Sequence, residues 1–253
     1  MFTRRTFAIA FSILPFVPLL PGAAWAQGAQ LSGDTVETSG GPVTLHPVSH
    51  ASFLIGFGAN VIYVDPVGGA EAYRDLPRPT AILITHGHSD HFDLPTLEAI
   101  GAEVPLLVSA AVFELLPAGL KSRAKAIGNG ESGTLLDIPV EAIGAYNTTA
   151  DRLQFHPKGV GNGYVLTFSD KRIYVAGDTE DVPEMRALTD IEVAFLPMNL
   201  PYTMTVEQAA DAVKAFKPRI VYPYHSRGSD LEAFAGRVGD ASEVRIRNWY
   251  PSA

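Results

Sequence analysis

Short apolar runs separated by turns dominate the first third of the chain. The first three lie at Val43–Val48, Ser52–Phe57 and Asn60–Asp65, and Gly56 and Gly58 mark a turn between the last two. Short apolar runs bounded by turn signals are typical of β-strands. The pattern therefore predicts that the fold begins with antiparallel strands.

Apolar positions with helical spacing appear between later strand-like runs. Leu94–Ile100 and Ala110–Leu116 are predicted helices, and Asp93 is placed to cap the first of them. The clearest helix start is Thr205, because Gln208 follows three residues later and completes a capping-box pattern. This helix ends before Pro218, and one further helix is predicted at Leu231–Val238.

The remaining apolar runs predict strands that alternate with these helices. They lie at Ala81–Thr85, Val104–Val108, Glu141–Ala145, Tyr164–Phe168, Arg172–Ala176, Glu192–Leu196, Arg219–Tyr224 and Glu243–Arg247. Each half of the chain thus contains strands followed by strand–helix units. This order predicts an α/β protein whose two halves pack sheet on sheet, with the helices outside.

Residues 1–26 have the pattern of a secretory signal peptide. A pair of arginines opens an apolar stretch that ends in Ala24-Trp25-Ala26, a cleavage-site pattern. The arginine pair followed by Phe7 resembles a twin-arginine signal. An uncleaved anchor is the alternative, but three prolines interrupt its short apolar core. We expect cleavage, a periplasmic or secreted location and no stable membrane anchor.

Composition narrows the partners of the mature chain. Residues 27–41 are rich in Gly, Ser and Thr and are expected to form a flexible lead-in to one domain at residues 42–253. Loss of residues 1–26 removes two arginines and takes the net charge from −8 to −10. That charge, without any long basic run, argues against nucleic acid as a partner. The chain has no cysteine, so any metal must be held by nitrogen and oxygen ligands.

A dense group of candidate metal ligands follows the predicted strand Ala81–Thr85. His86, His88, Asp90 and His91 lie within six residues. Neutral imidazoles and carboxylates bind zinc, and also iron or manganese. In an extended segment His86 and His88 point to the same side, so the turn can offer two ligands to one metal and two to a neighbour.

Two metal sites need more ligands, and three candidates lie downstream. Asp178 follows the predicted strand Arg172–Ala176, and His225 follows Arg219–Tyr224. Strand ends that meet at one rim are where α/β proteins build sites. His156, in a long loop, is the third candidate. Asn147 is its rival, although asparagine is a poor zinc ligand.

These motifs together resemble the metallo-β-lactamase-fold hydrolases, over residues 43–250. The resemblance rests on His86-x-His88-x-Asp90-His91, Gly177-Asp178-Thr179 and His225. Further stretches resemble the branch that includes ascorbate-6-phosphate lactonase-like proteins and N-acyl phosphatidylethanolamine phospholipase D. They are Ala145-Tyr146-Asn147, His156-Pro157-Lys158-Gly159, Ile173–Thr179 and Tyr202-Thr203-Met204-Thr205.

The resemblance implies a four-layer αββα sandwich with two mixed β-sheets and two divalent metal ions, zinc first and manganese or iron as alternatives. The first metal would be held by His86, His88 and His156. The second metal would be held by Asp90, His91 and His225. Asp178 would bridge the two metals. In relatives the third histidine often stands nearer to Asn147, which leaves only this ligand open.

The implied activity is hydrolysis of an ester, lactone or phosphodiester by a hydroxide that bridges the metals. Asp178 or Asp90 would take the proton of the attacking water. Asp65 is expected to hydrogen-bond a ligand histidine, or else to cap a turn. His50 is expected to contact substrate near the metals, or to be structural.

Loop residues are further candidates for substrate contact, each with a structural role as the alternative. They are Asn199, Tyr202, Lys158 and Arg227. The partner is expected to be a small molecule, and the sequence leaves the oligomeric state open. A different class of function is an exported metal-binding or scaffold protein that keeps the fold without catalysis.

Overall fold

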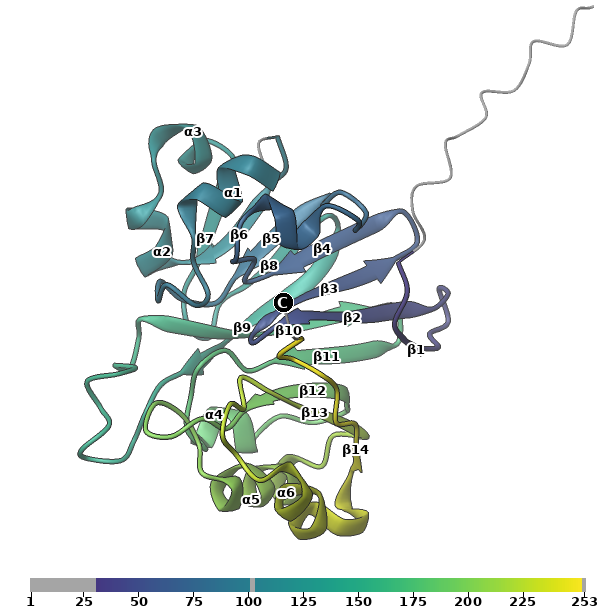
Figure 1. The fold of residues 1–253 in the computed structure, drawn as a ribbon, viewed down its shortest axis with the longest axis vertical. Coiled ribbons are helices and arrows are strands. Elements are labelled where there is room, and N and C mark those ends of the chain that lie inside the picture. The colour runs from purple at the N-terminus through teal and green to yellow at the C-terminus, as the bar shows by residue number, and fades with distance from the viewer. Residues whose placement is uncertain (1–30, 101–102, 252–253) are drawn as a thin grey trace, which may run out of the picture.

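The computed structural model describes residues 31–100 and 103–251. The expected signal peptide lies outside the described residues. Two seven-stranded sheets face each other, and helices cover their outer surfaces, as Figure 1 shows. No helix in the described ranges combines the length and apolar character needed to cross a bilayer.

The first sheet takes its strands in chain order. These are β1 (Asp34–Val36), β2 (Val43–Ser49), β3 (Ser52–Phe57), β4 (Asn60–Val64), β5 (Ala81–Ile84), β6 (Leu106–Ser109) and β7 (Ala124–Ile127). Strands β1 to β4 pair antiparallel, as the turns between the apolar runs predict, and β4 to β7 pair parallel. Three helices cover the outer face: α1 (Leu94–Ile100), α2 (Ala110–Leu115) and α3 (Ala118–Lys121).

The second sheet repeats this plan. Its strands are β8 (Ser132–Leu135), β9 (Ile138–Ala145), β10 (Gly161–Phe168), β11 (Lys171–Val175), β12 (Ile191–Pro197), β13 (Ile220–Tyr224) and β14 (Glu243–Val244). Strands β8 to β11 are antiparallel and β11 to β14 are parallel. Its helices are α4 (Pro183–Arg186), α5 (Val206–Phe216) and α6 (Leu231–Val238). Two short 3₁₀ turns lie at Ala70–Tyr73 and Gly239–Ala241.

The core lies in three apolar layers. The central layer joins the inner faces of both sheets, where the rings of Phe53 and Phe195 stack at 4.2 Å. A second layer lies between the second sheet and α4–α6, and a third between the first sheet and α1–α3. The order of layers is therefore helix, sheet, sheet, helix, and the predicted four-layer sandwich of two mixed sheets is confirmed.

The helix starts agree with the capping patterns in the sequence. Thr205 and Gln208 form both capping-box bonds, at 3.1 and 2.9 Å, so α5 begins where the pattern predicts. Asp93 accepts a bond from the backbone N–H of Thr96 at 3.1 Å and caps α1. The expected strand Glu243–Arg247 is shorter, because Arg247 turns away to pair with Asp34.

Residues 27–41 are expected to form a flexible lead-in, but the structure has a strand within this segment. Asp34–Val36 pairs with β2 as β1, and Val36 is buried. Asp34 accepts hydrogen bonds from Arg247 and from the Tyr222 hydroxyl, which lie in the other half of the chain. A buried valine and a paired carboxylate thus fix a segment whose composition alone suggests a mobile loop.

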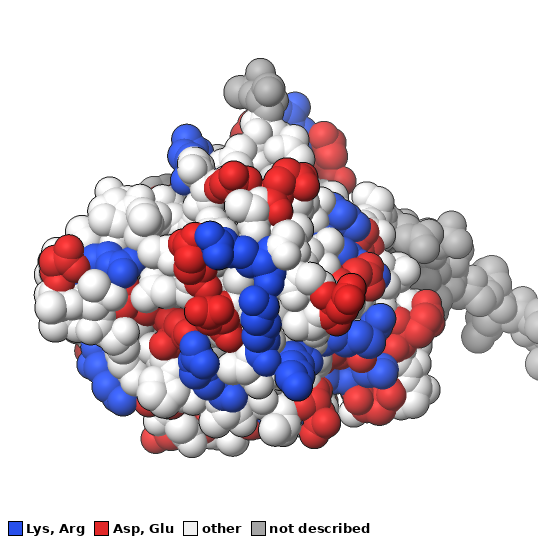
Figure 2. Space-filling view, turned by 90° about the horizontal axis from the view of Figure 1, so that it is seen from below, with Lys and Arg blue, Asp and Glu red and all other residues white. Residues whose placement is uncertain are grey.

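The surface on the side of α5 and α6 mixes charges of both signs, as Figure 2 shows. Arg237 of α6 pairs with Glu207 of α5 at 2.8 Å, and Lys171 pairs with Glu192 at 3.2 Å. Basic side chains on this face therefore stand beside acidic ones.

Candidate metal centre

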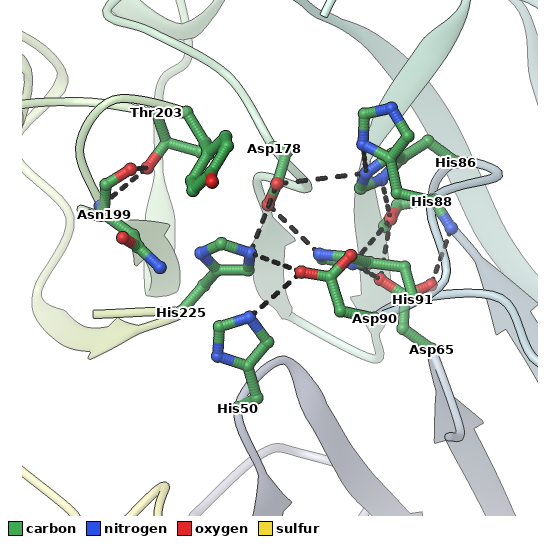
Figure 3. Close-up of polar contacts among 12 residues, drawn as sticks. His50, Asp65, His86, His88, Asp90, His91, Asp178, Asn199, Thr203 and His225 are labelled. Carbon is green, nitrogen blue, oxygen red and sulfur yellow. Dashed lines mark hydrogen bonds and ion pairs between the residues drawn. The ribbon is translucent and has the colours of Figure 1, made fainter. Parts of the chain in front are cut away.

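The turn after β5 delivers four of the predicted ligands to one end of the sandwich (Figure 3). The backbone N–H groups of His91 and Phe92 both donate to the carbonyl of His88, at 2.9 and 2.8 Å, which closes the turn tightly. His86 and His91 are buried, whereas His88 and Asp90 are more open to solvent. The buried strand Ala81–Ile84 gives the turn a rigid base.

Asp178 and His225 reach the same place from the second sheet. Asp178 follows β11 and His225 follows β13, at the ends expected from the sequence. Gly177 has a φ of 64°, and a Cβ there would lie 2.7 Å from the carbonyl oxygen of Asn162. Only glycine allows this close approach, which aims Asp178 at the first sheet.

One ligand group surrounds a single oxygen of Asp178. His156 Nε2 lies 3.2 Å and His86 Nε2 lies 3.8 Å from Asp178 Oδ2. His88 Nδ1 is 3.1 Å from His86 Nε2. The four ligand atoms lie within 4.8 Å of one another, which is close enough to hold one cation.

A second group shares Asp178 with the first. His91 Nε2 lies 3.3 Å from Asp178 Oδ1, and His225 Nε2 lies 3.2 Å from Asp178 Oδ2. Asp90 Oδ2 is 3.3 Å from His225 Nε2 on the other side. The structure thus brings the seven candidate ligands together in overlapping groups. Asp178 lies with the first three histidines and also with His91 and His225, while Asp90 joins through His225, beside His50.

Several atoms at the centre lack the partners that buried polar atoms need. His91 Nε2, His156 Nε2 and Asp178 Oδ1 are buried without a hydrogen-bond partner among the described residues. Unpaired buried polar atoms are costly, so their convergence needs an explanation. Divalent cations satisfy nitrogen and oxygen lone pairs of this kind, and the donor set fits zinc, manganese or iron. The residues therefore fit bound metal ions.

Burial and neighbouring charges prepare the ligands for cations. Burial lowers the pKa of His86 well below its usual value, and burial with the nearby His156 lowers the pKa of His88. Both imidazoles are therefore neutral, the form that binds metal. Burial raises the pKa of Asp178, but the imidazoles of His225 and His91 outweigh it and hold that pKa well below its usual value.

His91 and Asp90 show the opposite effect of mutual pairing. Burial lowers the pKa of His91, but the carboxylates of Asp178 and Asp65 outweigh it and raise that pKa well above its usual value. The pKa of Asp90 is lowered, because bonds to His225 and His50 outweigh its burial. A cation must therefore displace a proton from His91 when it binds.

Asp65 supports the second group from behind. Its Oδ2 lies 2.7 Å from His91 Nδ1 and accepts the Thr85 hydroxyl at 2.6 Å. Its Oδ1 accepts the backbone N–H of Thr85 at 2.7 Å. An imidazole that donates through Nδ1 has a free lone pair on Nε2, so Asp65 orients His91 toward Asp178.

His50 lies in the turn between β2 and β3 and contacts the outer side of the second group. Its Nε2 is 3.2 Å from Asp90 Oδ2, and its Nδ1 is 2.9 Å from the Tyr250 hydroxyl. Its ring lies 3.9 Å from the ring of His225. Both ring nitrogens thus contact protein groups, and His50 holds Asp90 in place.

His156, rather than Asn147, reaches Asp178. The amide nitrogen of Asn147 donates to the carbonyls of Tyr202 and Arg152, at 2.7 and 3.0 Å. His156 Nδ1 lies 3.1 Å from the same Tyr202 carbonyl. Asn147 therefore closes the loop that carries His156, and it also fixes the loop against residues 199–203.

Glu180 and Arg152 were not singled out by the sequence, although both stabilise this loop. The fully buried Glu180 accepts the backbone N–H groups of Thr148 and Thr149, each at 2.7 Å, and pairs with Arg152 at 2.9 Å. Burial opposes ionisation, but these bonds lower the pKa of Glu180. Arg152 also donates to the Thr203 carbonyl at 2.9 Å. The only sequence signal is an acidic residue two positions after Asp178.

The other candidates lie around the rim. Asn199 donates its backbone N–H to the Thr203 hydroxyl at 2.8 Å and lies on the His225 side of the site (Figure 3). Tyr202 packs its ring on Phe155 at 5.0 Å. Lys158 donates to the Tyr146 hydroxyl and pairs with Glu184, while Arg227 lies over the Tyr250 ring. The contact with substrate expected for these residues stays a prediction.

Comparison with known proteins places this site in a family. A model described as the β-lactamase superfamily domain matches residues 44–225. A UPF0173 metal-dependent hydrolase of Pyrococcus horikoshii is 32% identical over 216 residues, which cover 79% of this chain and 93% of that protein. The chain belongs to the UPF0173 metal-dependent hydrolase family of the metallo-β-lactamase superfamily.

Solved structures share the fold of this chain. A proposed metal-dependent hydrolase from Parabacteroides distasonis is 37% identical, with a TM-score of 0.80 over 87% of this chain and 100% of that one. A metallohydrolase from Ignicoccus hospitalis shares the fold at 24% identity and a TM-score of 0.68, over 81% and 94% of the two chains. The chain is thus a metal-dependent hydrolase with a His/Asp metal site.

Proposed function

We propose that the protein is a binuclear metallohydrolase that cleaves an ester, lactone or phosphodiester bond in a small molecule. The observation that carries this proposal is the position of Asp178, whose carboxylate lies within 4 Å of histidines from both ligand groups. The first cation would bind His86, His88 and His156. The second cation would bind Asp90, His91 and His225. Asp178 would be a ligand of both cations.

Cations held by these residues would supply a water whose pKa is lowered to about 7 and a positive charge for the oxygen of the bond to be cleaved. A carboxylate of the chain would then accept the proton of the attacking water. The Asp90 side chain is 46% exposed, whereas that of Asp178 is 3% exposed. Asp90 is therefore the carboxylate that can take a proton and return it to solvent, while Asp178 holds the ligand groups together.

The proposal extends to the identity of the metal, the branch of the superfamily and the cellular location of the protein. Zinc is the first choice, with manganese or iron as alternatives, because all donors are imidazole or carboxylate. The lactonase-like and phospholipase D-like branch, rather than true β-lactamases, guides the choice of substrates. Residues 1–26 support export to the periplasm, and the net negative charge without a long basic run supports a partner other than nucleic acid.

A substrate panel with defined metals tests the proposal. Protein reconstituted with zinc or manganese should hydrolyse at least one class among lactones, aryl esters, phosphodiesters and phosphonates, and β-lactams poorly. His88→Ala and Asp178→Ala should abolish turnover. His46→Ala is a matched control, because His46 lies on β2 and its Nδ1 is 2.6 Å from the Ser32 carbonyl, outside the two ligand groups. Activity equal in wild type and His88→Ala would contradict the proposal. Metal binding without turnover of any class would favour the exported metal-binding protein instead.

A further inference from the structure

A cavity of about 220 Å³ opens beside the first ligand group. Residues from three separate segments line it: His86, Gly87, His88, Ala111, Leu115, Phe155, His156, Pro157, Val160 and Gly161. Its three histidines are the ligands proposed for the first cation. Every other lining residue is apolar or glycine, and the described residues contribute no charged side chain to its wall.

The rim of this cavity exposes apolar surface that the fold does not need to expose. Leu115 is 54% and Val160 is 41% exposed, and both belong to the five exposed large hydrophobic side chains among the described residues. Single exposed apolar residues need no explanation, but neighbours around a concave site mark ligand contacts. Leu115 ends α2 and Val160 precedes β10, so distant parts of the chain meet here (Figure 1).

Gly87 lets α2 approach the ligand turn. A Cβ at Gly87 would lie 2.8 Å from Leu115 Cδ1, so glycine permits the leucine to form the wall directly beside His86 and His88. On the opposite wall the Phe155 ring is held by Tyr202 at 5.0 Å. The cavity is therefore lined by apolar side chains beside the three imidazoles.

We propose that this cavity binds an uncharged apolar group of the substrate, such as a short acyl chain or a phenyl ring, next to the bond to be cleaved. This inference rests on the proposed function. A water molecule occupies about 30 Å³ in the liquid, so the cavity has room for about seven non-hydrogen atoms. A long lipid chain would extend beyond it.

Away from the three histidines a charged group is a poor occupant, because the other lining residues are apolar or glycine and offer it no partner. The nearest cation along the chain, Lys158, is held by Glu184 at 2.9 Å and by the Tyr146 hydroxyl at 3.0 Å. A phosphate or carboxylate between Leu115, Phe155 and Val160, out of reach of the proposed cation, would lose its hydration without compensation. The apolar group therefore enters this cavity, and polar parts of the substrate lie over the more open Asp90 side.

Alkyl hydroxamates of increasing length test the inference by binding, without turnover. The hydroxamate head binds metal ions, and the tail reports on the cavity. Calorimetry on the zinc-loaded protein should give a Kd that falls about two- to fourfold per methylene, the latter corresponding to ~0.8 kcal/mol, from acetyl to octanoyl. The decanoyl compound should bind no tighter than the octanoyl compound.

Variants separate the cavity from general effects on the protein. Leu115→Asp should weaken hexanoyl binding at least tenfold and leave acetohydroxamate within twofold. Ala111→Phe should weaken octanoyl more than butyryl binding. Leu153→Asp is the matched control, because Leu153 is 46% exposed but does not line the cavity, and it should bind like wild type.

Each remaining outcome counts against a different claim. A Kd that does not depend on tail length in wild type would overturn the apolar subsite and leave the metal site standing. If Leu115→Asp then also changed the sedimentation of the protein, the apolar rim would be an interface between two copies. Failure of every hydroxamate to bind the zinc-loaded protein would overturn the proposed function and this inference together.

Discussion

Asp65→Asn should disable the second metal site while it keeps the shape of the side chain. Asp65 Oδ2 lies 2.7 Å from His91 Nδ1 and 2.6 Å from the Thr85 hydroxyl. An amide places an N–H donor where Oδ2 now accepts, because the other oxygen must still accept the backbone N–H of Thr85. His91 can then keep a hydrogen bond only by accepting at Nδ1, which moves its proton to Nε2.

This change of tautomer has a cost that follows from the contacts. Nε2 is the His91 atom that lies 3.3 Å from Asp178, and a protonated Nε2 cannot bind a cation. Changes to groups that orient metal-bound histidines cost about 10- to 100-fold in metal affinity. The hydrogen bonds that Asp65 Oδ2 accepts from His91 and Thr85 also lose their charge, and each loss should lower the free energy of unfolding by about 1 kcal/mol. The second site should therefore weaken by about 1.4–2.7 kcal/mol in binding free energy.

Competition with a chelator measures both sites in one titration. We expect the first equivalent of zinc to bind Asp65→Asn as it binds wild type, and the second to bind about 10- to 100-fold more weakly. Asp34→Asn is a matched control, because Asp34 also accepts several bonds, from Arg247 and Tyr222, but lies away from the ligands. Unchanged affinity for both equivalents in folded Asp65→Asn would refute the role given to Asp65.

Three further predictions concern the stability of the folded protein. Glu180→Gln should lower the free energy of unfolding by about 3–5 kcal/mol, because it leaves the partly buried Arg152 without its carboxylate partner. Urea titration measures this change. A loss below about 1 kcal/mol would contradict the prediction. The pKa of Asp90 lies below its usual 3.8, so its carboxylate stabilises the metal-free fold above pH 3.8, and this contribution is lost as the pH falls toward the folded-state value. Acid titration of metal-free Asp90→Asn should therefore show a shallower loss of stability than wild type; parallel curves would count against the pairing with His50 and His225. Removal of metal by a chelator should lower the melting temperature, and zinc at about 100 times its Kd should restore about 2.7 kcal/mol per site; equal melting curves with and without zinc would be inconsistent with a folded-state metal site.

The sequence predicts those parts of the fold that are strongly apolar or carry a local signature. Ser52–Phe57 and Leu94–Ile100 have the predicted bounds, because an apolar run and a capping residue decide each of them locally. β7 and β8 were not predicted, since Ala124–Ile127 and Ser132–Leu135 each contain one fully buried residue among partly exposed ones. Such short edge strands are defined by their neighbours in the sheet.

The same division holds for the site. Ligand types and strand ends are local features, and they were enough to predict that His86 and Asp178 belong to one site. Glu180 could not be singled out, because its role depends on backbone N–H groups of a loop more than thirty residues earlier in the chain. The apolar cavity likewise cannot be predicted from the sequence, since Leu115 and Val160 come together only in the folded chain.

Metal content of the reconstituted protein tests the central claim most directly. After loading with zinc and removal of excess metal, elemental analysis should find about two zinc ions per chain in wild type. His88→Ala should retain about one, because the contacts among the ligands proposed for the second cation are unchanged in this variant: Asp90, His91, His225 and Asp178. A wild-type content of one or none, with folded protein and correct concentration, would contradict the binuclear centre.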